Sequence, residues 1–108
     1  MKPEIDLTGP QRDALRRVFA RHAESFEGVG VYGSRARGTA RPGSDVDLVV
    51  YGEIPPEALT AIRADLEDSS LSIFADVVAL ASISHPGLRA EIARSAKPLF
   101  GREELLAR

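Results

Sequence analysis

The chain has 108 residues, of which 44% are hydrophobic and 28% are charged, and its formal net charge at pH 7 is −2. This length and composition predict one small globular domain over residues 1–108, and the acidic balance argues against independent binding to nucleic acid. The absence of cysteine excludes disulfides and thiolate metal sites. The N-terminus lacks the apolar core of a signal peptide, and no run approaches the length of a membrane span. We therefore expect a cytoplasmic protein.

The N-terminal half predicts helices and strands in alternation. Thr8 to Pro10 has the residues of a helix start, with Thr8 or Gly9 as the cap. Apolar side chains then recur at helical spacing to about Ser25, which predicts one buried stripe. After this helix we expect a strand over 28–32, a short helix over 34–39, a turn over 41–44 and a strand over 45–51.

The C-terminal half continues the alternation with a helix over 57–67, a strand over 73–80 and a helix over 86–96. Segment 98–101 is expected to close the core, and the tail after it reads as a further helical turn or a frayed end. The order of these elements predicts an α/β or α+β domain, in which helices cover a small sheet.

Three aspartates carry the strongest chemical signal in the chain. Asp45 and Asp47 are two residues apart at the start of a strand, so their side chains point the same way, about 6.6 Å apart. Because both faces of this strand are apolar beyond the acids, we expect it to lie inside the sheet. Asp76 interrupts an otherwise apolar strand and comes level with the pair if the two strands are neighbours. Three such carboxylates suit two Mg²⁺ ions and an in-line phosphoryl displacement.

Each aspartate also has a simpler interpretation when it is taken alone. Asp45 follows Pro-Gly-Ser and could cap a turn, and Asp47 could be an exposed strand residue. Asp76 is harder to explain in this way, because burying an unpaired charge costs several kcal/mol. The three together favour a metal site.

The Gly-Ser pair that precedes the acids predicts contacts to phosphate. Gly33 at a strand end allows close approach to the backbone, and amides at the start of the next helix favour an anion. Ser34 can donate its hydroxyl to a phosphate oxygen. Arg35 or Arg37 can neutralise the leaving pyrophosphate with a planar guanidinium, and Ser44, just before the acid pair, is a further nucleotide-binding candidate. A Gly-Ser pair alone more often marks a turn, so its value comes from the acids that follow.

Gly33-Ser34, ten intervening residues, Asp45-x-Asp47 and a later Asp76 together resemble the DNA polymerase β-like nucleotidyltransferase superfamily. GSRARG followed by SDVDLVV looks most like its minimal nucleotidyltransferase (MNT) branch, over about residues 10–100. The resemblance implies a small mixed sheet flanked by helices. It also implies transfer of a nucleoside monophosphate from a triphosphate such as ATP to a hydroxyl. Asp45 and Asp47 would then bind the metals, Asp76 would complete the site, and Gly33 and Ser34 would hold the triphosphate.

Many stand-alone MNT proteins are antitoxins of HEPN-domain ribonuclease toxins, and some transfer AMP to the toxin, commonly to a tyrosine. Because this chain keeps all three acids and lacks the additional domains of larger relatives, the resemblance favours an active, Mg²⁺-dependent adenylyltransferase in a hetero-oligomer with a HEPN toxin. Two alternatives stay open. One is an antitoxin that acts by binding alone, and the other is an enzyme that modifies a small molecule.

Overall fold

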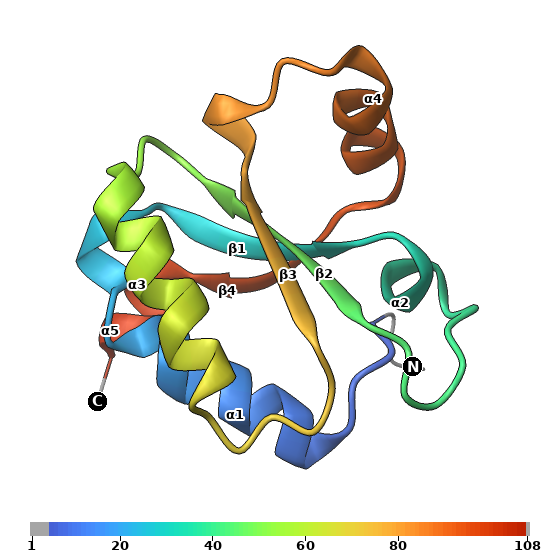
Figure 1. Ribbon diagram of the computed structural model, residues 1–108, viewed down its shortest axis with the longest axis horizontal. Coiled ribbons are helices and arrows are strands. Elements are labelled where there is room, and N and C mark those ends of the chain that lie inside the picture. The colour runs from blue at the N-terminus through green and yellow to red at the C-terminus, as the bar shows by residue number, and fades with distance from the viewer. Residues whose placement is uncertain (1–4, 108) are drawn as a thin grey trace.

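Four strands form one mixed sheet in the order β3-β2-β1-β4 (Figure 1). The computed structural model describes residues 5–107, and its strands are β1 (Gly28–Tyr32), β2 (Val46–Tyr51), β3 (Ala75–Ala79) and β4 (Lys97–Gly101). β1 is antiparallel to β2 and to β4, whereas β2 and β3 are parallel. The predicted position of β2 inside a small mixed sheet is therefore confirmed.

Helices connect these strands and cover the sheet. They are α1 (Gly9–Ala20), α2 (Ser34–Arg37), α3 (Pro56–Glu67), α4 (Pro86–Ser95) and α5 (Arg102–Leu106), with 3₁₀ turns η1 (Ala23–Ser25) and η2 (Leu80–Ser82). Thr8 caps α1 as predicted, since its hydroxyl accepts from the backbone N–H of Gln11 and the Gln11 side chain accepts from the backbone of Thr8. This reciprocal pairing satisfies two amides that a helix start leaves unpaired.

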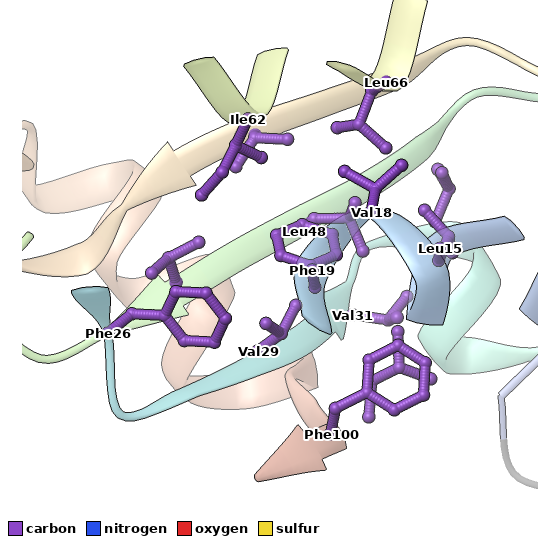
Figure 2. Packing of buried hydrophobic residues seen from close by; sticks show 14 of the residues in the cluster. Leu15, Val18, Phe19, Phe26, Val29, Val31, Leu48, Ile62, Leu66 and Phe100 are labelled. Carbon is purple, nitrogen blue, oxygen red and sulfur yellow. The ribbon is translucent and has the colours of Figure 1, made fainter. Parts of the chain in front are cut away.

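The main core lies between one face of the sheet and helices α1, α3 and α5, which gather on one side of the molecule (Figure 1). Figure 2 shows Phe19 of α1 and Ile62 of α3 packed over the strand residues Val29 and Leu48. Phe19 also meets the ring of Phe26 edge to face, with ring centroids 5.9 Å apart. Alternate residues of the strands therefore point into this layer, and those between them are left for the opposite face.

Helix α4 covers part of that opposite face. Ile92 of α4 is buried against Tyr32 of β1 and Val49 of β2, in a second and smaller apolar cluster. The remainder of this face carries polar side chains at the end of the sheet where β2 begins. The candidate functional residues lie there.

Some boundaries differ from those predicted. Segment 97–101 is a strand, and the tail forms helix α5. β3 begins at Ala75 instead of residue 73, and α1 ends at Ala20, after which the chain continues as a 3₁₀ turn to Ser25. Within residues 5–107, no helix combines the length and the apolar character needed to cross a membrane.

Candidate functional site

The three aspartates lie together at one end of the parallel β2–β3 pair. Asp47 of β2 is the register partner of Asp76 of β3, so their side chains leave the same face of the sheet. Asp45 comes two residues before Asp47, just outside β2, and is therefore on the same side of the chain. The expectation that Asp76 comes level with the acid pair is confirmed, because the two strands are neighbours in this register.

The same row continues into β1, where Tyr32 is the register partner of Asp47. Tyr32 is only 6% exposed. Burial, followed by the charges of Asp47, Asp76 and Glu91, raises the pKa of Tyr32 to about 12. The phenol thus stays protonated at neutral pH and can donate a hydrogen bond beside the carboxylates.

The negative charges of the three aspartates repel one another. Burial raises the pKa of Asp47, and the negative charges of Asp76, Asp45 and Glu91 raise it further. A cation would relieve this repulsion, and the three aspartates offer only oxygen donors, which Mg²⁺ prefers. In the part of the chain from 5 to 107, no three acidic or histidine side chains converge closely enough to hold a metal ion as they stand. The oxygen donors and the uncompensated negative charge of the three aspartates nevertheless fit a divalent cation.

Gly33 is the residue that lets the Asp47 carboxylate approach the backbone. Its φ of 76° and ψ of −149° lie in a region that is essentially restricted to glycine. A Cβ at this position would lie 2.8 Å from Oδ2 of Asp47. The backbone N–H of Gly33 donates to Oγ of Ser95, at 3.0 Å. A side chain at position 33 would strain the turn and also push Asp47 out of the row.

Ser34 opens the four-residue helix α2, next to Gly33. Its hydroxyl makes no hydrogen bond to any other residue in the range 5–107, and its side chain is partly exposed. This hydroxyl can therefore donate to an incoming phosphate without breaking a contact. The predicted phosphate-binding role of Ser34 remains a proposal.

Arg35 points away from solvent and is only 4% exposed. Its guanidinium donates through Nε and Nη2 to the carbonyl of Ser44, at 3.1 and 2.8 Å, and through Nη1 to the carbonyl of Asp6, at 2.7 Å. Three donors are thus used to fix the turn that precedes the acid pair. These contacts favour a structural role for Arg35 over the predicted contact with nucleotide.

Arg37, two residues further along α2, is half exposed and forms an ion pair with Glu91 of α4. Ser44 uses its carbonyl for Arg35, as described, and its Oγ accepts from the backbone N–H of Arg41, at 3.1 Å. Arg37 therefore keeps guanidinium donors free for phosphate, and the Ser44 hydroxyl, which acts only as an acceptor toward Arg41, keeps its own proton free to donate. The predicted contacts of Arg37 and Ser44 with nucleotide remain proposals.

Three residues of this region escaped the sequence-based reasoning: Tyr32, Glu91 and Ser95. Tyr32 directly precedes the Gly-Ser pair and reads as an ordinary strand residue. Glu91 and Ser95 come from a helix more than 40 residues after the acid pair. Their spacing of four residues on α4, which puts both side chains on one face, is the signal that could have indicated them.

A small mixed sheet that aligns an Asp-x-Asp pair with a third aspartate, beside a Gly-Ser turn, defines a nucleotidyltransferase of the polymerase β type. The family model for polymerase beta nucleotidyltransferases matches residues 14–105, and the chain belongs to this family. No curated protein sequence matches the chain. The predicted superfamily and fold are thereby confirmed.

Solved structures place the chain more closely within the family. It is 34% identical to a candidate minimal nucleotidyltransferase, covering 82% of this chain and 89% of that one with a TM-score of 0.61. This likeness confirms the predicted MNT branch. A toxin–antitoxin crystal structure with AMP-PNP is 21% identical, with 87% and 79% of the two chains covered and a TM-score of 0.66. The toxin–antitoxin MntA-HepT is 18% identical, with 87% and 73% covered and a TM-score of 0.63. These two share the fold.

Proposed function

We propose that this protein is a Mg²⁺-dependent nucleotidyltransferase that transfers AMP from ATP to a hydroxyl, most simply a tyrosine, of a HEPN-domain toxin. It would act as the antitoxin in a cytoplasmic hetero-oligomer. The observation that carries the chemistry is the register of Asp47 with Asp76, with Asp45 two residues before. The partner is supported by the fold shared with two toxin–antitoxin structures, one of which was solved with AMP-PNP.

In this proposal Asp45, Asp47 and Asp76 hold the Mg²⁺, as two ions. When bound, Mg²⁺ neutralises the charge that develops on the phosphate oxygens. Ser34 and Arg37 donate to the triphosphate, and Gly33 lets it approach the backbone. The acceptor oxygen forms a bond to the α-phosphorus, the bond from that phosphorus to the bridging α–β oxygen breaks, and pyrophosphate leaves. Asp76, on the exposed edge strand β3, takes the hydroxyl proton of the acceptor.

A labelling experiment tests this function. Purified protein is mixed with α-labelled ATP, Mg²⁺ and the protein encoded by the neighbouring gene. We expect label on the partner, no label in excess EDTA, and a loss of at least about 10³-fold in rate for Asp45→Asn. Equal labelling by Asp45→Asn, or none by the wild-type protein, contradicts the proposal.

A second candidate is an antitoxin that neutralises its toxin by binding alone. It rests on the fold that the chain shares with two toxin–antitoxin structures. Growth of cells that express the toxin separates the two functions. If binding is sufficient, Asp76→Ala protects such cells as well as the wild-type protein does. If transfer is required, Asp76→Ala binds the toxin but does not protect.

Transfer to a small molecule is the remaining candidate, and it predicts a different acceptor requirement. In that case AMP would be transferred from ATP to a low-molecular-weight fraction of a cell extract in the absence of any protein partner. We expect no such product, because the acceptor in our proposal is a hydroxyl of the partner protein, which this mixture lacks.

A further inference from the structure

Helix α4 reaches the Gly-Ser turn through two side chains that lie one helical turn apart, Ser95 and Glu91. Ser95 is 8% exposed. Its Oγ accepts from the backbone N–H of Gly33 at 3.0 Å, and its own proton is directed to the carbonyl oxygen of Glu91 at 2.9 Å or to Oε2 of Glu91 at 3.2 Å. Because Gly33 adopts a conformation that other residues rarely reach, a fixed partner for its N–H restricts the turn to that conformation.

The carboxylate of Glu91 is shared between two arginines. Oε2 accepts from Nη1 of Arg37 on α2, and Oε1 accepts from Nη2 of Arg94 at 2.7 Å. The Arg37 side chain is half exposed, and among residues 5–107 Glu91 is its ion-pair partner. Glu91 uses one of the five N–H donors of Arg37 and leaves the others for a ligand.

The negative charge of Glu91 is compensated by its two arginine partners, Arg37 and Arg94. Glu91 adds to the negative field that raises the pKa of Asp47 and of Tyr32, so it lies within electrostatic reach of the acid row. Alone it would repel a triphosphate, whereas Arg37 and Arg94 outweigh it by one positive charge. The three groups together present a net cation next to the Gly-Ser turn.

We infer that Glu91 and Ser95 are positioning residues for the triphosphate: Glu91 holds the guanidinium of Arg37 toward the phosphates, and Ser95 holds the Gly33 turn beneath them. This inference rests on the proposed nucleotidyltransferase function and extends it to α4, which the sequence motif does not include. Immobilising a long side chain costs several-fold in affinity when the ligand has to do it. A contact that fixes Arg37 in advance therefore lowers the concentration of nucleotide that is needed.

The decisive variant is Glu91→Gln, which keeps the size of the side chain and one oxygen acceptor but removes the charge. We expect the Kd of Mg²⁺–AMP-PNP, measured by calorimetry, and the KM for ATP in partner labelling each to rise roughly 3- to 10-fold. The kcat should stay within about twofold, because the three aspartates are untouched. Glu57→Gln is the matched control, because it removes the same charge from the exposed first turn of α3, beyond the opposite end of β2.

A double-mutant cycle shows whether Glu91 acts through Arg37. In an Arg37→Gln background, Glu91→Gln should cause no further rise in Kd, since the side chain that it positions is gone. Urea unfolding of every variant accompanies these measurements. A stability loss in place of a coupled change in Kd would indicate a role in packing only and would overturn the inference.

The outcomes separate this inference from the function on which it rests. If the wild-type protein labels its partner but Glu91→Gln has an unchanged or lower Kd and KM, the inference is wrong and the proposed function stands. An equal rise in Kd in the wild-type and Arg37→Gln backgrounds also overturns it. A wild-type protein that binds no Mg²⁺–AMP-PNP contradicts both.

Discussion

At the scale of single residues, Gly33 is the position where backbone geometry and chemistry depend on each other most directly. We expect Gly33→Ala to lower the free energy of unfolding by about 2–4 kcal/mol. Its φ of 76° strains any other residue, at a cost of about 1–3 kcal/mol, and the added Cβ would meet Oδ2 of Asp47 at 2.8 Å. Urea unfolding, monitored by circular dichroism, measures this loss of stability.

Gly43→Ala is the control for this substitution. Gly43 also has a positive φ, of 85°, but a Cβ there would have nothing within 4 Å. It should therefore lose only the backbone strain, about 1 kcal/mol. Equal losses for the two variants would show that the contact of Gly33 with Asp47 contributes nothing to the effect.

In the absence of metal, the charged carboxylate of Asp47 should lower the free energy of unfolding relative to a neutral side chain at the same position. Because burial and three neighbouring carboxylates raise its pKa above the ordinary 3.8, the folded state binds this proton more tightly than the unfolded state does. Protonation of Asp47 therefore stabilises the folded state. This stabilisation is complete below about pH 3.8, the pKa in the unfolded state, and is lost as the pH rises through the folded-state pKa. We expect Asp47→Asn, which removes this charge, to stabilise the protein at pH 7 by about 1 kcal/mol.

Urea unfolding at pH 7 and again near pH 3.5 checks this prediction, since the advantage of Asp47→Asn should vanish at the lower pH. Asp13→Asn, on the exposed face of α1, should change stability by less than about 0.5 kcal/mol at either pH. A variant that is less stable than the wild-type protein at pH 7 would show that Asp47 has a favourable partner in the folded state.

Reasoning from the sequence succeeded for residues whose chemistry is unusual for their place in the chain. Asp76 was indicated because a carboxylate in an apolar strand needs an explanation, and its alignment with Asp47 followed once the strands proved to be neighbours. Arg35 could not be separated from Arg37 in this way, because the two differ in the direction of their side chains on a single turn of helix. The contacts of Arg35 with two carbonyls depend on the fold of residues 6 and 44 around it.

At the scale of elements, the side chain of Arg35 ties the four-residue helix α2 to the backbone of residues 6 and 44. We expect Arg35→Ala to lower the free energy of unfolding by about 2–4 kcal/mol, because the carbonyls of Ser44 and Asp6 lose a buried charged donor. Hydrogen exchange should accelerate over residues 38–45, the segment that this guanidinium ties to α2.

Arg41→Ala provides the comparison, since the Arg41 side chain is exposed and its bonds to Ser44 come from the backbone, where its N–H donates to Oγ and its carbonyl accepts from the N–H of Ser44. Its stability should stay within about 0.5 kcal/mol of the wild-type value. If both variants unfold at the same urea concentration, the hydrogen bonds of the Arg35 side chain do not stabilise the fold as predicted.

The sequence predicted three of the four strands because each has a run of apolar residues bounded by turn residues. For residues 98–101 the sequence indicates only a segment that closes the core. A proline within a five-residue run is unfavourable for a strand. Pro98 is tolerated because β4 is an edge strand, and its pairing with β1 shifts register beside Gly30. Such pairing joins residues about 70 positions apart, so no local pattern could reveal it.

At the scale of the whole molecule, we expect the proposed site to couple ligand binding to folding, because its residues come from β1, α2, β2 and β3 and are brought together only in the folded state. A ligand that binds only the folded state at 100 times its Kd adds about 2.7 kcal/mol of stability. For a domain of this size that corresponds to roughly 10–20 °C in Tm. We expect such a rise with ATP and Mg²⁺ together, and a much smaller one with ATP in excess EDTA.

Asp47→Asn makes this thermal measurement specific, because its two expected effects have opposite signs. Without ligand the variant should melt above the wild-type protein, since the repulsion around residue 47 is relieved. With Mg²⁺ and ATP the variant should melt below the wild-type protein, since the carboxylate that we propose to hold the metal is lost, together with the binding contribution of about 2.7 kcal/mol. A general change in stability would move both melting temperatures in the same direction. If the two curves keep their order when ligand is added, Asp47 does not take part in binding Mg²⁺–ATP.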